Sequence, residues 1–196
     1  MYIPNRFEKA KFLDIEEDIQ KEVRKQLSES KKGVALYGDA GVGKSWNLYA
    51  IAEYLEKTFG AGYSNKTEKN PEGDYSSGFK IDFFDFGELV NRLKNFNSEF
   101  DGQELLDRLT NVKEASRTIL FLDDLAVSAK NPDFAVENLR MILNVRYNEN
   151  LPVFISTNYS LEEMAEKLGK RNFSRIQGLC KMLPMVGEDR RKKEIE

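Results

Sequence analysis

The chain has 196 residues, a formal net charge of −3, one cysteine and no histidine. A single cysteine excludes an internal disulfide and indicates a reducing, cytoplasmic setting, while the lack of histidine excludes histidine-based acid–base chemistry and histidine metal ligation. No apolar run approaches the ~20 residues of a membrane helix, and the N-terminus lacks the apolar core of a signal peptide, so we expect no membrane partner.

The N-terminal part of the chain shows a helix, a strand and a second helix. Asp14 is a candidate helix cap, and the apolar residues that follow it at helical spacing are Ile15, Ile19, Val23 and Leu27. The apolar run Val34–Tyr37 predicts a buried strand, and the helix after it ends at Phe59, before Gly60. Residues 60–78 are rich in Gly, Asn and Ser, which predicts a long surface loop.

Strands and helices continue to alternate in the rest of the chain. Lys80–Phe84 and Thr118–Leu122 read as strands, and between them Asp85 caps one helix and Gln103–Leu109 forms a shorter one. The elements expected after these are a helix from Asn131-Pro132 to about Arg146, a strand at Pro152–Ser156, a helix from a Ser160 capping box to Gly169, a helix at Phe173–Leu179 and a strand near Met182–Val186. Five near-continuous apolar strands separated by helices predict an α/β fold whose five-stranded parallel sheet is covered on both faces.

A phosphate-binding loop is the most specific motif in the chain. The sequence Gly38-Asp39-Ala40-Gly41-Val42-Gly43-Lys44-Ser45 fits the pattern G-x-x-x-x-G-K-[ST] at every fixed position, between a strand and a helix. In this interpretation backbone amides wrap a polyphosphate, Lys44 neutralises the β- and γ-phosphates and Ser45 holds Mg²⁺. The candidate ATP-binding residues are therefore the eight residues of the loop and Trp46 after it. The alternative is a glycine-rich turn that binds nothing.

A pair of carboxylates ends the strand that begins at Thr118. The run Ile119–Leu122 is followed by Asp123 and Asp124, about 70 residues after the phosphate loop. In P-loop NTPases an acidic residue at such a strand end completes the Mg²⁺ site. We therefore interpret Asp123 as a metal-binding residue and Asp124 as the residue that orients or polarises the attacking water. For Asp124 the alternative is a turn or helix cap.

Together these motifs resemble the AAA+ ATPase domain of bacterial and phage replicative helicase loaders of the DnaC/DnaI type, and the similar IstB-type transposition ATPases. Leu120–Leu125 resembles the Asp-Asp form of Walker B, and Ser156–Leu161 resembles the sensor 1 segment, which puts Asn158 at the sensor position. Arg171–Ile176 resembles the arginine-finger box, with Arg175 at the finger. Gly187–Arg191 resembles the terminal segment that carries a sensor 2-like arginine, with Arg191 preferred over Arg190 by spacing.

The resemblance assigns further roles. It implies that Asn158 contacts the γ-phosphate and the lytic water, that Arg175 acts in trans on the site of a neighbouring subunit, and that Arg191 contributes to nucleotide binding. As alternatives, Asn158 is an ordinary turn former and Arg175 a surface salt-bridge residue. The resemblance further implies a P-loop, three-layer α-β-α sandwich with a reduced or absent lid. The single domain would comprise a lead-in and first helix (1–32), a core (33–187) and a tail (188–196).

The resemblance leads to an expected function. The chain would bind and hydrolyse ATP with Mg²⁺, assemble into a spiral or ring, and help to place a hexameric replicative helicase on single-stranded DNA. Alternatives are a transposition ATPase, a phage protein that binds a host helicase or loader with nucleotide as a structural switch, and a small-molecule P-loop kinase, which leaves the sensor and finger without a role. Met1 lies only a few residues before the ATPase lead-in, whereas loaders usually carry a separate helicase-binding domain.

The C-terminal part of the chain is locally basic. Nine Lys or Arg residues and only two acids lie between Lys167 and Lys193. The overall negative charge argues against a wholly basic nucleic-acid binder, but it leaves room for a local patch. A solvated surface and a contact with phosphate or DNA both remain open for this stretch.

Overall fold

The computed structural model describes residues 3–59, 79–94, 102–128 and 130–190. Its centre is a five-stranded sheet in the order β2-β3-β4-β1-β5, in which every pair of neighbouring strands is parallel. The strands are β1 (Gly33–Tyr37), β2 (Lys80–Asp85), β3 (Thr118–Asp123), β4 (Val153–Thr157) and β5 (Cys180–Pro184).

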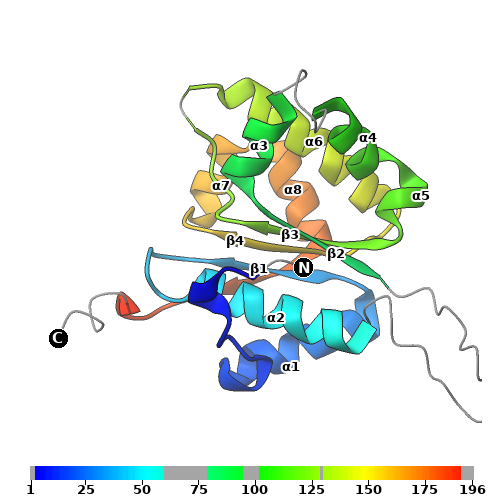
Figure 1. Ribbon diagram of the computed structural model, residues 1–196. Helices are drawn as coiled ribbons and strands as arrows, with labels where there is room; N and C mark the ends of the chain where they lie inside the picture. Colours follow the sequence, from blue (N-terminus) through cyan, green and yellow to red (C-terminus); the bar gives the residue numbers. More distant parts are fainter. Residues whose placement is uncertain (1–2, 60–78, 95–101, 129, 191–196) are drawn as a thin grey trace, which may run out of the picture.

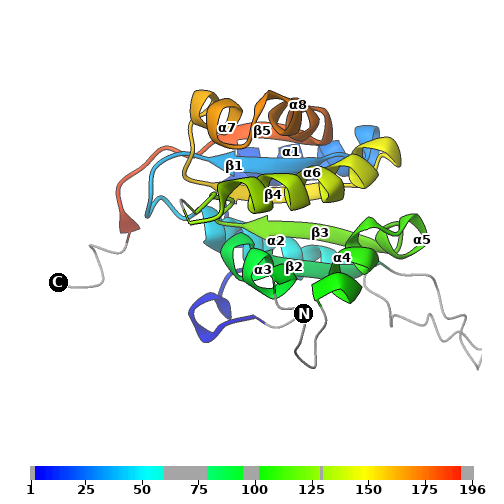
Figure 2. The ribbon, with the colours of Figure 1, turned by 90° about the horizontal axis from the view of Figure 1, so that it is seen from above.

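Helices cover both faces of this sheet, so the molecule has three layers (Figure 1). The short turns η1 (Asn5–Phe7), η2 (Phe12–Asp14) and η3 (Gln26–Ser30) lie with α1 (Glu17–Lys25) and α2 (Lys44–Phe59) on one face. The other face carries α3 (Phe86–Lys94), α4 (Gly102–Thr110), α5 (Val112–Ala115), α6 (Pro132–Asn148), α7 (Leu161–Lys167) and α8 (Lys170–Leu179). Figure 2 shows α8 on the β5 side of this face, α6 across the middle and α3 and α4 on the β2 side. Among the described helices, none is both long and apolar enough to cross a membrane.

Each face of the sheet has its own apolar core, because successive side chains of a strand point to opposite faces. In β3, Leu120 and Leu122 belong to the core under α3, α4, α6 and α8, whereas Ile119 and Phe121 belong to the core under α1 and α2. All four side chains are at most 3% exposed. The central strands β1, β3 and β4 are therefore buried on both sides, whereas the edge strands β2 and β5 are partly exposed, and the predicted three-layer α/β architecture is confirmed.

Most element boundaries agree with the sequence expectations, and three differ: the start of α1, the start of α8 and the position of β5. Asp14 was expected to cap the first helix, but it ends η2, and α1 begins at Glu17. Ile15 between them has an extended backbone (φ −86°, ψ 164°) and is buried in the core under α1 and α2. This extended residue separates η2 from α1. Helix α8 begins at Lys170 rather than near Phe173.

The last strand is displaced by two residues from its expected position. Strand β5 pairs with β1 from Gly33↔Cys180 to Tyr37↔Pro184, and Val186 beyond it is 91% exposed. Pairing with β1 therefore sets the strand's ends, which local hydrophobicity does not. Helix α5, capped by Asn111, was not expected, and the surface loop expected at residues 60–78 lies outside the described residues.

Candidate functional site

The phosphate loop connects the end of β1 to the start of α2, as the motif predicts. Three glycines have positive φ, namely Gly38 (140°), Gly41 (85°) and Gly43 (98°), a backbone conformation that other residues rarely adopt. Lys44 at the start of α2 is only 6% exposed, and its ammonium donates to the carbonyls of Gly38 (2.9 Å) and Asp39 (2.6 Å). The lysine thus lies folded against the inside of its own loop, at the N-terminus of a 16-residue helix.

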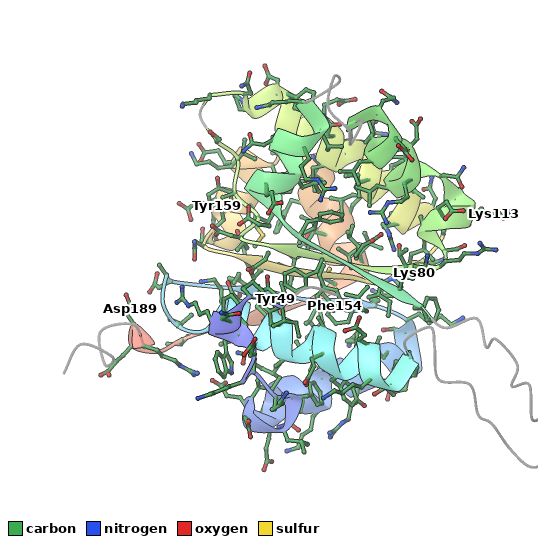
Figure 3. The ribbon with its side chains drawn as sticks, in the orientation of Figure 1. Tyr49, Lys80, Lys113, Phe154, Tyr159 and Asp189 are labelled. Atoms are coloured by element: carbon green, nitrogen blue, oxygen red, sulfur yellow. The ribbon has the colours of Figure 1, made fainter. Side chains whose placement is uncertain are left out.

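A cavity of about 570 Å³ opens beside this loop at the carboxyl ends of the strands. It is lined by Arg6, Phe7, Ala40, Gly41, Gly43, Lys44, Ser45, Trp46, Asp85, Asp123, Asp124, Ser156, Asn158 and Arg190. In open parallel sheets the crevice outside the carboxyl ends of the strands is where ligands bind. Figure 3 places Tyr159 and Asp189 toward this edge, and Lys80 and Lys113 at the opposite one.

Asp123 lies at the wall of the cavity and is largely buried. Its carboxylate accepts hydrogen bonds from the hydroxyls of Ser156 and Ser45. Burial raises the pKa of Asp123 above its ordinary value; the nearby charge of Asp124 acts in the same direction, while the hydroxyl bonds oppose it. A buried carboxylate is therefore held next to the hydroxyl of the phosphate-loop serine.

These groups fit a magnesium ion. Mg²⁺ prefers oxygen ligands and is usually held by one or two carboxylates together with substrate phosphates and water, rather than by an all-protein cage. Ser45 and Asp123 supply a hydroxyl and a carboxylate within hydrogen-bonding distance of each other, and a cation would relieve the unfavourable burial of the carboxylate. Within the described residues no group of three or more acidic or cysteine side chains is arranged to hold a metal.

Asp124 adopts the left-handed conformation (φ 48°), which directs the chain away from β3. Its backbone N–H donates to Ser156 Oγ at 2.9 Å, and its Oδ1 accepts from Asn158 Nδ2 at 3.0 Å. Both Asp124 and Asn158 are exposed to the cavity, in contrast to Asp123. The two adjacent carboxylates therefore have different surroundings, one buried beside Ser45 and one open to water.

The C-terminal segment 185–190 lies along the phosphate loop. Met185 N–H donates to Tyr37 O at 2.7 Å, and Arg190 N–H donates to Gly41 O at 3.1 Å. A Cβ built on Gly41 would lie 1.9 Å from Asp189 Oδ1, so a side chain here would displace the Asp189 carboxylate, besides straining a backbone with φ 85°. The contacts bring the Arg190 guanidinium to the cavity wall, beside Gly43.

The lead-in before the first helix contributes the remaining wall of the cavity. The ring of Phe7 stacks on Tyr49 with centroids 4.4 Å apart, and Tyr49 stacks on Phe83 at 4.1 Å. The series of stacked rings continues from Phe83 through Phe121 to Phe154, on the face of the sheet that α1 and α2 cover. Phe7 is thus the outer ring of a packed aromatic series, and its position depends on three segments that are far apart in the sequence.

Not every candidate residue lies in the cavity wall. Arg175 and Arg191 apart, there are twelve candidate residues, and nine of them line the cavity. The three exceptions are Gly38, Asp39 and Val42. The side chain of Val42 is 2% exposed and belongs to the core under α1 and α2. Arg175 lies on α8 and donates to Asn144 Oδ1 of α6 at 2.7 Å. Arg191 lies outside the described residues, whereas Arg190 lines the cavity. The lining residues that sequence reasoning did not single out for the site are Arg6, Phe7, Asp85 and Ser156.

Comparison with known proteins agrees with this geometry. No family model matches the sequence. The chain is 30% identical over 172 residues to the replicative helicase loader DnaI of Bacillus subtilis, an alignment that covers 82% of this chain and 48% of DnaI. The fold of the DnaC helicase loader matches with a TM-score of 0.71 and 22% identity, over 93% of this chain and 100% of that one.

The replication initiator DnaA is also similar in fold. Its structure bound to AMPPCP and single-stranded DNA matches with a TM-score of 0.66 and 16% identity, over 92% of this chain and 51% of DnaA. The fold and the cavity thus define a P-loop domain of the AAA+ class, which is a nucleotide-binding ATPase fold. Within that class, the sequence is similar to that of the helicase loader DnaI, and the fold is similar to those of the DnaC and DnaI loaders. It spans about half the length of the curated relatives that it matches.

Proposed function

We propose that this chain is the ATPase domain of a replicative helicase loader, a single AAA+ domain that binds Mg·ATP, self-associates and helps to place a hexameric helicase on single-stranded DNA. The observation that supports it best is the convergence of the phosphate loop, Asp123, Asp124 and Asn158 on one cavity in a homologue of DnaI. DnaI itself is a replicative helicase loader, and DnaA has been seen with AMPPCP and single-stranded DNA.

The phosphate loop and the start of α2 hold the polyphosphate in this proposal. The loop amides and the α2 N-terminus favour negative charge, and Lys44 exchanges its two carbonyl partners for phosphate oxygens. Because those carbonyls are neutral, an anionic phosphate is a stronger partner for the ammonium. Arg190 adds a second cation at the cavity wall, so we assign the nucleotide-contacting role expected of Arg191 to Arg190.

Hydrolysis is divided between the two adjacent aspartates. Asp123 and Ser45 would hold Mg²⁺, and the bound ion would offset the charge that develops on the phosphate oxygens. Asp124, open to solvent and oriented by the Asn158 amide, accepts a proton from or polarises the attacking water. Asn158 can at the same time offer its second N–H to the γ-phosphate, since its amide carries two donors.

Arg175 completes the site of a neighbouring subunit. It is not among the residues that line the cavity of its own chain, and one of its guanidinium nitrogens, Nη1, is buried without a hydrogen-bond partner in the described structure. Burial, with Arg171 and Arg140 nearby, lowers the pKa of Arg175 from its ordinary value, so the surroundings of the guanidinium favour the approach of an anion. A γ-phosphate presented by another copy of the chain would meet this need.

Nucleotide binding is tested first, with Trp46 as the probe. Trp46 is the only tryptophan of the chain and it lines the cavity, so its fluorescence reports on occupancy. Lys44→Ala should abolish the fluorescence change and the thermal stabilisation by Mg·ATP. That stabilisation is about 2.7 kcal/mol for the wild type at a hundredfold excess over Kd. Lys57→Ala, an exposed lysine on the same helix, is the matched control and should behave as wild type. A fully retained response in Lys44→Ala would contradict the nucleotide site.

Loading is then tested with purified components. The chain, with ATP and the replicative helicase encoded beside it or in its host, should increase the amount of helicase retained on circular single-stranded DNA. Lys44→Ala and Arg175→Ala should both lose this effect. Mg·ATP binding without any binding to the helicase or effect on its loading would refute the loader assignment and leave the ATPase intact.

A further inference from the structure

The hydroxyl of Ser156 contacts both aspartates. This serine lies on β4 beside the end of β3 and is 1% exposed. Its Oγ donates to Asp123 Oδ1 and accepts the backbone N–H of Asp124 at 2.9 Å. We infer that Ser156 is a positioning residue that sets the different roles of Asp123 and Asp124 in Mg·ATP hydrolysis, an inference that rests on the proposed function.

The bond to Asp123 fixes the orientation of its carboxylate. A carboxylate offers about four lone-pair sites on two oxygens, and Ser156 occupies one of them from the β4 side. The carboxylate also meets the hydroxyl of Ser45, the residue expected to share the metal. Ser156 therefore presents the remaining lone pairs of Asp123 to Ser45, and without its hydroxyl the buried carboxylate is held only by Ser45 and the backbone of Asp124.

The bond to Asp124 stabilises an unfavourable backbone conformation. A left-handed residue other than glycine is uncommon, and it persists where surrounding contacts hold it. Here Ser156 supplies two such contacts, because its Oγ accepts the N–H of Asp124 and its carbonyl accepts the N–H of Leu125 at 2.8 Å. This turn directs the Asp124 side chain to Asn158, two residues beyond Ser156, so both acids are oriented from the same short stretch of chain.

Thr157 provides a matched control. It follows Ser156 on the same strand and is 0% exposed. Its hydroxyl donates to Leu125 O at 2.7 Å and accepts from Tyr159 N–H at 3.1 Å, and neither of these two partners is an aspartate. Removal of either hydroxyl should cost stability, because each leaves buried polar groups unpaired. Only removal of the Ser156 hydroxyl should change the response to magnesium.

The experiment compares Ser156→Ala, Ser156→Thr and Thr157→Val with the wild type. Apo thermal unfolding measures stability, Trp46 fluorescence measures ATP binding in EDTA and over a Mg²⁺ titration, and phosphate release measures hydrolysis. We expect Ser156→Ala to bind ATP in EDTA within twofold of wild type, while its Mg²⁺ requirement rises and its hydrolysis falls by about 10–100-fold. Ser156→Thr, which keeps the hydroxyl, should recover most of both losses. Thr157→Val should lose stability and keep the wild-type Mg²⁺ requirement.

Two results would overturn the inference. One is a wild-type Mg²⁺ requirement and hydrolysis rate in folded Ser156→Ala, and the other is an equal shift in Thr157→Val. If Ser156→Ala does not fold, Ser156→Cys keeps the side-chain shape with a somewhat larger and more weakly hydrogen-bonding group, and it is judged by the same criteria. A wild-type chain whose ATP binding does not respond to Mg²⁺ would instead overturn the proposed function, and the inference with it.

Discussion

Asn158 donates a hydrogen bond from Nδ2 to Oδ1 of Asp124 across 3.0 Å, although the two residues are 34 positions apart in the chain. The amide comes from the end of β4 and the carboxylate from the end of β3, which are neighbouring strands of the sheet. A carboxylate held by an amide donor keeps one oxygen for its partner and presents the other to the cavity. The two side chains should therefore act as one unit in hydrolysis.

This coupling predicts non-additive losses of activity. Asp124→Asn and Asn158→Ala should each retain Mg·ATP binding and each lower the rate of phosphate release by at least about 100-fold, as for the loss of a positioned acid–base group. The double variant should lose less than the product of the single losses, because residues in contact do not contribute independently. Asp133→Asn, an exposed acid in the first turn of α6, is the control. Strictly multiplicative losses would show that the contact is unimportant for hydrolysis.

The trans role of Arg175 predicts complementation between inactive variants. Arg175→Ala should bind Mg·ATP normally but lose hydrolysis, since a trans-acting arginine contributes about 10³–10⁵ in rate where it works as in activated GTPases. Mixing Arg175→Ala with Lys44→Ala should restore activity in proportion to the mixed interfaces, because an intact loop then meets an intact arginine. Arg24→Ala, on α1 at the opposite face, is the control. A wild-type rate per subunit that stays constant down to monomeric concentrations would rule the role out.

The raised pKa of Asp123 predicts how stability depends on pH without metal or nucleotide. Its pKa lies above the ordinary 3.8 because burial disfavours the charged form. Between 3.8 and the raised value the folded state holds a proton that the unfolded state has released, so this contribution to stability is complete below 3.8 and is lost as the pH rises through the folded pKa. Asp123→Asn should therefore be more stable than wild type near pH 7, with a difference that disappears below about pH 4. Denaturant unfolding over about pH 3–8 measures this, and a constant difference would contradict it.

The capping box of α7 predicts a modest effect on stability alone. Ser160 Oγ accepts from Glu163 N–H at 3.2 Å, and the Glu163 carboxylate accepts from Ser160 N–H at 2.8 Å. Ser160→Ala should lower the free energy of unfolding by about 1 kcal/mol, and the Tm by about 2–4 °C for a chain of this size. Nucleotide binding should not change. Ser28 is an exposed serine in η3, and Ser28→Ala is the control. It should change the Tm by no more than about half the loss expected for Ser160→Ala. An unchanged Tm in Ser160→Ala would mean that water replaces the cap.

Several features were predictable from the sequence because they depend on neighbouring residues. The capping box at Ser160 and Glu163 was predicted from a spacing of three residues, and the structure confirms both of its hydrogen bonds. The phosphate loop was predicted from eight consecutive residues, and the structure places it between β1 and α2. Asp14 shows the limit of such reasoning, because a suitable cap residue did not begin a helix where burial of Ile15 required an extended backbone.

The sequence by itself determined most of the elements, their α/β order and the candidate residues for binding phosphate and metal, since these follow from local periodicity and from motifs of a few residues. Only the tertiary structure decided which distant residues share the cavity. Ser156, Asp85 and Phe7 gave no local signal, because a serine, an aspartate or a phenylalanine near a strand end has many ordinary roles. Each reaches the site through the pairing of strands or the stacking of rings between segments far apart in the chain. Those long-range contacts depend on the packing of the whole domain, which no short stretch of sequence specifies.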